Sequence, residues 1–175
     1  MRGFTLVEIL ISFAILVLVM LAIFSVMDIG RNAWFLGDVS TQVRHEIINA
    51  FTNMDRELKE TRPSQQSLSI GTTSAQLTFK IPQDGNGDGT VLDVNGNIEW
   101  SDDITYALNG AHELTRTVSG VPPVTSVLAR DIVTAQFSRP LSTINLLVID
   151  ITAQKASSAG RIVQDSGEIR IKMRN

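Results

Sequence analysis

Cysteine is absent from this 175-residue chain. Its absence excludes a disulfide framework, a thiolate nucleophile, and any zinc or iron–sulfur site held by cysteines. An excess of positive charge is also missing, because 15 lysines and arginines face 18 aspartates and glutamates, for a formal net charge of -3. The chain therefore lacks the overall basic surface of a nucleic-acid-binding domain, and no nucleic-acid partner is expected for it. Its length sets one ordinary domain, with room for an appendage, as the expectation.

Charge is scarcest at the start of the chain, where Arg2 and Glu8 are the only charged residues among the first 27. Nineteen uncharged residues run from Ile9 to Met27. As an α-helix they measure about 29 Å, which matches the ~30 Å hydrocarbon core of a bilayer. A cleaved secretory signal has a shorter apolar core and a small-residue cleavage site after it. The sequence therefore predicts a retained membrane helix over residues 4–27.

Glu8 is the one acidic residue of this segment and lies just inside its apolar boundary. A carboxylate that faces lipid at full depth costs about 2.5–3.5 kcal/mol, so something must offset that cost. Two explanations are open from position alone. Either Glu8 lies shallow enough to reach the headgroups, or a specific cation meets it inside the membrane.

The chain begins with MRGFTLVEIL. This segment resembles the type IV prepilin signature, a short basic leader that ends in glycine, followed by Phe-Thr-Leu-x-Glu and an uninterrupted apolar helix. The resemblance implies that prepilin peptidase cuts between Gly3 and Phe4 on the cytoplasmic side and that the new Phe4 amine is N-methylated. Residues 1–3 are then a leader peptide. The helix stays in the bacterial inner membrane as a single span, with the head in the periplasm or outside the cell.

The same resemblance implies a role for Glu8 in assembly, because the family's matching carboxylate is thought to meet the N-terminal amine of a neighbouring subunit. Such a pair is physically reasonable, since cleavage creates the positive charge that a carboxylate in low dielectric lacks. A buried ion pair is better attested as a device that sets register than as a source of stability. We therefore expect the pair to fix the axial register between subunits.

Beyond Met27 the apolar residues become periodic, with spacings of three and four. One helical stripe is formed by Leu36, Val39, Val43, Ile47, Ala50, Phe51, Met54 and Leu58. This period predicts an amphipathic continuation of the helix over residues 28–62 that fastens the head to the stalk. Pro63 ends the pattern. Gly30 and Gly37 weaken the junction by about 1 kcal/mol each and allow a bend or local melting there.

After Pro63 the apolar period becomes two, which indicates half-buried strands. Strand candidates are Leu77–Ile81, Ile104–Leu108, His112–Val118, Val127–Leu128, Ile132–Phe137, Ile144–Thr152 and Glu168–Met173. Asn109-Gly110 between two of these runs is a hairpin signal. Residues 63–175 are therefore expected to form a β-rich globular head. The predicted fold class is α+β, a long N-terminal helix packed on a mainly antiparallel sheet.

Within the head, the Ile-Thr-Tyr-x-Leu run at residues 104–108 and the Leu-Thr-Arg run at residues 114–116 are similar to minor pseudopilins of the J/W type. These proteins belong to type II secretion and type IV pilus systems. Two departures concern the major pilins: the membrane half has no proline, and the chain has no C-terminal cysteine pair. Both departures make a major pilus subunit the less favoured interpretation.

An acidic, glycine-rich loop over residues 84–90 resembles the start of an EF-hand calcium loop, with oxygen-bearing residues at alternate positions. The candidate calcium ligands are Asp84, Asn86, Asp88, Thr90 and Asp93. Asn95 stands at the twelfth position, where that loop type has glutamate, so Glu99, Asp102 or Asp103 would have to complete the coordination. The alternative is a plain Gly/Asp-rich turn. A bound Ca²⁺ would be structural.

These observations favour a structural subunit over an enzyme, because no nucleophile, base and orienting group come together in the sequence. The leading hypothesis is a minor pseudopilin of a type II secretion system. Its expected partners are other pilin or pseudopilin subunits, prepilin peptidase and the inner-membrane assembly machinery. Two alternatives stay open: a minor pilin of a type IV pilus or competence system, and a single-pass anchored binding module that does not polymerise.

Overall fold

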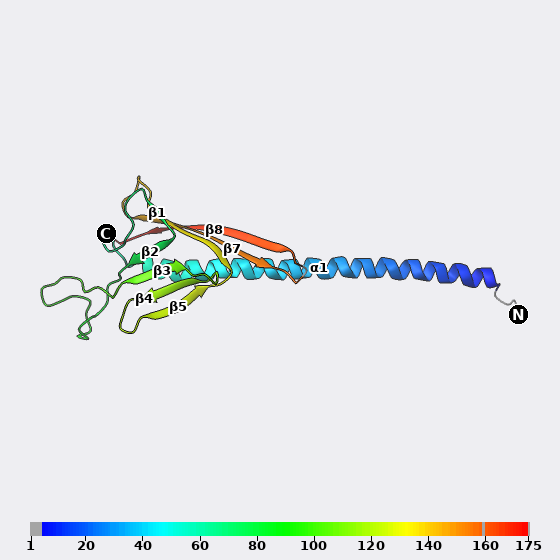
Figure 1. The fold of residues 1–175 in the computed structure, drawn as a ribbon, viewed down its shortest axis with the longest axis horizontal. Helices are drawn as coiled ribbons and strands as arrows, with labels where there is room; N and C mark the ends of the chain where they lie inside the picture. The colour runs from blue at the N-terminus through cyan, green and yellow to red at the C-terminus, as the bar shows by residue number, and fades with distance from the viewer. Residues whose placement is uncertain (1–4, 159, 175) are drawn as a thin grey trace.

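A computed structural model describes residues 5–158 and 160–174 of the chain. Its elements are one long helix, α1 (Leu6–Leu58), and the strands β1 (Thr73–Ser74), β2 (Gln76–Phe79), β3 (Ile104–Leu108), β4 (Leu114–Val118), β5 (Val124–Ala129), β6 (Ile132–Ser138), β7 (Leu146–Ala156) and β8 (Ile162–Lys172). The apolar first half of α1 projects from the head, and both sheets lie along its second half (Figure 1).

Helix α1 is continuous over 53 residues, which corresponds to about 80 Å. Thr5 caps its N-terminus, because the Thr5 side chain accepts a hydrogen bond from the Glu8 backbone N–H at 3.3 Å. Gly30 and Gly37 both lie within the helix, so the bend or melting that they allow is not present in this state. Two glycines cost about 2 kcal/mol together, which is small beside the cooperativity of a helix of this length.

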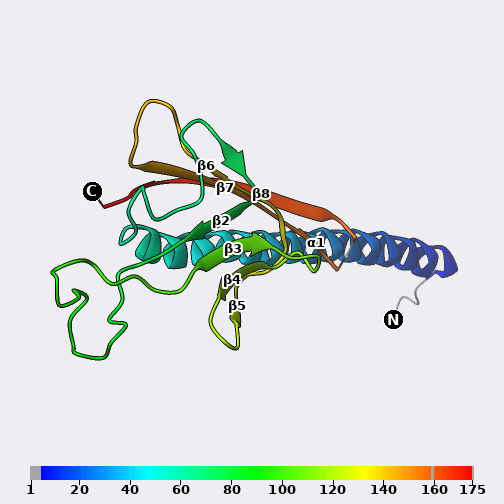
Figure 2. The same cartoon turned by 60° about the vertical axis from the view of Figure 1, so that its left-hand side comes forward.

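The strands form two four-stranded antiparallel sheets, with the orders β2-β3-β4-β5 and β1-β6-β7-β8. The predicted Asn109-Gly110 hairpin joins β3 to β4, and Leu108 pairs with Leu114 at its end. The two sheets lie around the second half of α1, as Figure 2 shows. The α+β prediction is confirmed, with two antiparallel sheets in the head where the sequence pattern suggested one.

The core forms where the helical stripe meets the inner faces of both sheets. The stripe contributes Val39, Val43, Ile47, Ala50, Met54 and Leu58, all buried. The first sheet contributes Leu77, Phe79, Ile104, Tyr106 and Leu114, and the second contributes Ile132, Phe137, Leu147, Ile149, Ile151 and Ile171. These side chains pack the second half of α1 against both sheets, and their burial supplies the main driving force for docking.

Strand β8 begins at Ile162, several residues before the predicted start at Glu168. The sequence pattern does not predict this start, because Asp165 and Gly167 occupy positions where an inward-facing strand residue is usually apolar. The structure explains both residues. Asp165 pairs with Arg44 of α1 at 3.3 Å, and Gly167 lies directly against Phe51 and Ile47.

The close approach at Gly167 leads to a stability prediction. A Cβ atom at this position would lie 2.8 Å from Phe51 Cε2 and 3.1 Å from Ile47 Cγ2. Gly167→Ala is therefore expected to push β8 away from α1 and to lower the free energy of unfolding by about 1–3 kcal/mol. Urea unfolding of the full chain in detergent measures this change. Gly120→Ala is the control, because its Cβ would meet only ordinary contacts of 3.4 Å or longer, and an equal loss there would contradict the explanation.

Candidate functional site

The first turn of α1 is organised by short-range hydrogen bonds around Glu8. Thr5 is the N-cap and Glu8 is the third helical residue, which is the Thr-x-x-Glu arrangement of a capping box. The Ser12 hydroxyl donates to the Glu8 backbone carbonyl at 2.8 Å. A carboxylate in the first turn also interacts favourably with the helix dipole. Glu8 therefore has a role within its own helix in addition to the predicted role between subunits.

The apolar half of α1 is unprotected in the single chain. Every residue from Thr5 to Arg31 is exposed. Among the described residues, α1 is the helix that is long and apolar enough to cross a membrane by length and composition. Side chains of this kind stay exposed only in lipid or against other apolar helices, because exposure to water costs about 25 cal/mol per Å² of apolar surface.

The predicted cleavage and methylation site at Gly3 and Phe4 lies outside the described residues. Glu8 is described, and among the described residues its carboxylate forms no ion pair, as the pairing with a neighbouring subunit requires of it. The pairing itself concerns a second chain. The cleavage, the methylation and the charge pair therefore stay predictions.

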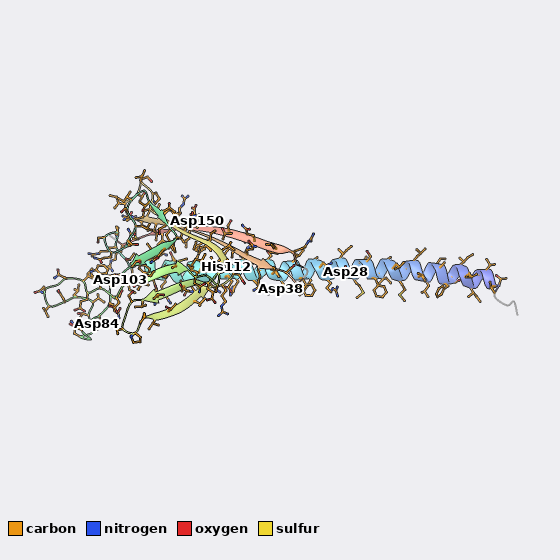
Figure 3. All side chains as sticks on the ribbon, in the orientation of Figure 1. Asp28, Asp38, Asp84, Asp103, His112 and Asp150 are labelled. Atoms are coloured by element: carbon orange, nitrogen blue, oxygen red, sulfur yellow. The ribbon has the colours of Figure 1, made fainter. Side chains whose placement is uncertain are left out.

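The acidic loop projects from the end of the head opposite the N-terminus, where Figure 3 marks Asp84. Its carboxylates are held by amides of the loop. Asp84 accepts hydrogen bonds from the backbone N–H groups of Gly87 at 2.6 Å and Gly89 at 2.8 Å. Glu99 accepts from the Gly85 N–H at 2.8 Å. These contacts are those of tight Asx-type turns.

Hydrogen bonding also affects the acidity of two of the candidate ligands. Bonds from the Thr90 hydroxyl and backbone N–H lower the pKa of Asp88, and bonds from Asn97 lower the pKa of Asp93. Within residues 5–158 and 160–174, no three histidine, aspartate or glutamate side chains are grouped so that they could hold a metal ion. Calcium binding by Asp84, Asn86, Asp88, Thr90 and Asp93 stays a prediction, and titration calorimetry with Ca²⁺ tests it.

Sequence reasoning missed a half-buried charge cluster between α1 and the first sheet. Glu57 of α1 accepts a hydrogen bond from the Tyr106 hydroxyl at 2.7 Å. Its two oxygens also accept from Arg116 Nε, both at 2.9 Å. One signal was available: Arg116 stands between Leu114 and Val118 on the inward-facing positions of β4, where an arginine needs an acidic partner.

The environment of Tyr106 predicts how stability depends on pH. Burial of the phenol, followed by its hydrogen bond to Glu57, raises the pKa of Tyr106 above its ordinary value. The folded chain therefore keeps the phenol proton at a pH where the unfolded chain releases it. The stabilising contribution is complete below the unfolded pKa of about 10 and declines as the pH rises above that value.

We expect the urea midpoint of the full chain to fall between about pH 9 and 11 more steeply than that of Tyr106→Phe. The phenylalanine variant loses the hydrogen bond but keeps the ring. Parallel slopes for the two proteins over this range would contradict the assignment to Tyr106.

The chain thus combines a long helix, apolar and exposed in its first half, with an antiparallel α+β head. Residues 1–24 match the family model described as the prokaryotic N-terminal methylation motif. No curated protein and no solved structure matches the chain. The motif, the apolar helix and the antiparallel sheets together fit a type IV pilin-like protein. The prediction of that class is confirmed, and the features are consistent with a single-pass membrane anchor.

Proposed function

We propose that this chain is a structural subunit of a type IV pilus-like fibre and, more narrowly, a minor pseudopilin of a type II secretion system. The observation that carries the proposal is the methylation motif at residues 1–24, followed directly by an apolar helix half that is wholly exposed in the single chain. The choice of a minor pseudopilin is supported by the likeness of residues 104–108 and 114–116 to the J/W type and by the chain's lack of cysteine.

Assembly moves the apolar half of α1 from lipid into a bundle of helices. Apolar packing is similar in both settings, so close helix contacts and charge pairing must favour the fibre. In this proposal prepilin peptidase removes residues 1–3, and Glu8 pairs with the new amine of a neighbouring subunit. The head lies in the periplasm or outside the cell. The inner-membrane assembly machinery supplies the energy that moves the helix from lipid into the fibre. The proposal involves no catalysis by this chain.

Mass spectrometry of the mature N-terminus tests the proposal. The expected result, in cells that contain prepilin peptidase, is a chain that lacks Met1–Gly3 and carries one methyl group on Phe4. The matched control is Gly3→Ala, which is expected to keep the leader. An intact Met1 in the wild-type chain of such cells would contradict the proposal and favour an anchored module that does not polymerise.

A minor pilin of a type IV pilus or competence system gives the same N-terminus, so a second measurement separates it from a pseudopilin. Deletion of the gene is expected to abolish export of proteins across the outer membrane while leaving surface pili intact. Loss of pili with normal export would favour the pilus assignment.

A further inference from the structure

The two sheets end in four edges, and the edges differ in how they are protected. Strand β1 has only two residues. The outer edge of β2 is covered by the preceding segment, where the Ser67 N–H donates to the Thr78 carbonyl at 2.8 Å and the Lys80 N–H donates to the Gln65 carbonyl at 2.9 Å. Short or covered edges of this kind do not pair with another chain. The edges of β5 and β8 remain.

Strand β5 is an open edge without charge. No charged residue occurs from Ser119 to Ala129, and Val124, Thr125, Ser126 and Val127 are exposed. Glu46 of α1 accepts a hydrogen bond from the Arg130 N–H at 2.8 Å just after the strand ends. An uncharged edge rich in β-branched residues is a template for an added strand.

Strand β8 is the second open edge and has 11 residues. Its four charged residues balance: Glu168 and Arg170 pair with each other at 2.6 Å, and Asp165 and Lys172 have opposite signs. The strand therefore presents no net charge to a neighbour. An uncharged partner such as β5 therefore meets no electrostatic repulsion at the β8 edge.

Contacts with α1 fix the direction and height of both edges. Arg116, which is paired with Ser126 of β5, contacts Glu57, whereas Arg130 contacts Glu46. Strand β5 therefore runs toward the apolar end of α1, as Figure 1 shows.

Strand β8 runs the other way over the same part of α1. Asp165 contacts Arg44, and the Arg174 N–H donates to the carbonyl of Thr61 at 3.0 Å. The two edges thus lie at the same height along the helix and point in opposite directions. Both strands also pack on α1, so they flank the exposed side of the helix.

We infer that β5 of one chain pairs antiparallel with β8 of a second copy beside it in the same membrane. Copies that share a membrane have parallel helices, and side by side they bring these two edges together at one height without rotating either anchor. The inference rests on the proposed function only for this shared orientation of the anchors.

Antiparallel pairing of β5 with β5 of a second copy is incompatible with a common membrane, because it would direct the two α1 helices oppositely. The β5–β8 contact is instead heterologous, since each copy uses a different edge toward each neighbour. Such a contact leaves a free edge at both ends of a pair, so it extends into a row of copies within the membrane.

Disulfide cross-linking between copies tests the inference. Because the chain has no native cysteine, every disulfide must come from the introduced cysteines. One population carries Thr125→Cys or Val127→Cys, and a second, differently tagged population carries Ser166→Cys, Glu168→Cys or Arg170→Cys. The full chains are reconstituted together in phosphatidylcholine vesicles and oxidised. Mixed disulfides are expected to exceed by about tenfold those formed by Gln76→Cys, a matched exposed control on the covered strand β2.

The pattern of cross-links shows whether β5 and β8 pair in an antiparallel register. Antiparallel pairing requires that a move of two residues forward on β5 shifts the best partner two residues back on β8. Val127→Lys added to the Thr125→Cys chain is expected to abolish the cross-link, because lysine on an edge opposes pairing, whereas Gln76→Lys is expected to leave it unchanged. Disulfides between two β5 cysteines, yields equal to the Gln76→Cys control, or no register dependence would overturn the inference.

This assay needs neither leader cleavage nor the fibre machinery. Its failure would remove the edge pairing and leave the proposed function standing. Failure of N-terminal processing together with a normal cross-link would contradict the proposed function and leave the edge pairing standing.

Discussion

Glu8→Ala is expected to leave leader cleavage intact and to lower incorporation into fibres by roughly a hundredfold. Without the carboxylate, the new Phe4 amine of the neighbouring subunit enters the low-dielectric bundle unpaired. Breaking a buried pair in this way costs about 3 kcal/mol or more, which corresponds to that factor. The measurement is the fraction of the chain recovered in sheared fibres, with mass spectrometry of the N-terminus as the check on processing.

Glu8→Gln is the matched control, because Thr5 and Glu8 have the Thr-x-x-Glu spacing of a capping box, in which the glutamate side chain bonds the N-cap N–H. Glutamine also fits the third position of a capping box but carries no charge. If the charge pair governs assembly, the glutamine and alanine variants fail alike. Normal incorporation of Glu8→Gln beside a failing Glu8→Ala would assign the effect to helix capping and contradict the pairing.

Glu57→Ala is expected to lower the free energy of unfolding of the head by about 2–3 kcal/mol. The substitution leaves the Arg116 guanidinium and the Tyr106 hydroxyl without their acceptor in a half-buried site, where the exposed fractions of the Arg116 and Glu57 side chains are 23% and 16%. Loss of one partner of a fully buried pair costs about 3–5 kcal/mol, and partial exposure reduces that figure. Urea unfolding of the full chain in detergent, followed by tryptophan fluorescence, measures the change.

Two controls separate the cluster from a general effect of removing charge from α1. Glu60→Ala removes an exposed carboxylate just beyond the helix and is expected to change stability by less than about 0.5 kcal/mol. Glu57→Gln keeps a hydrogen-bond acceptor for Tyr106 and is expected to fall between wild type and Glu57→Ala. Equal losses for Glu57→Ala and Glu60→Ala would contradict the role of the cluster.

Much of the fold could be predicted because the apolar period changes twice along the chain. The sequence is continuously apolar up to Met27, has a stripe at spacings of three and four up to Leu58, and alternates afterwards. Each pattern indicates how much of the element faces water or lipid. Periodicity reports the faces of single elements and carries no information on which strands pair. The division of the strands into two sheets was therefore not predictable.

The parts of the site that escaped prediction depend on tertiary contacts. In the sequence, Gly167 suggests a break in the strand and Asp165 suggests a solvent-exposed residue. In the structure, Gly167 packs against Phe51, and Asp165 pairs with Arg44. Glu57 lies outside the apolar stripe of the helix, where the sequence pattern alone indicates a solvated residue. Only the position of β4 shows that Arg116 and Tyr106 meet it. Contacts between residues 49 or more positions apart leave no local pattern in the sequence.

The buried core of the head begins at Val39, and no residue from Thr5 to Arg31 takes part in it. Membrane extraction is therefore expected to leave the head folded, and substitutions in the anchor are expected to leave its melting temperature unchanged. A gene that begins near Asp38 should yield a water-soluble fragment suited to crystallisation.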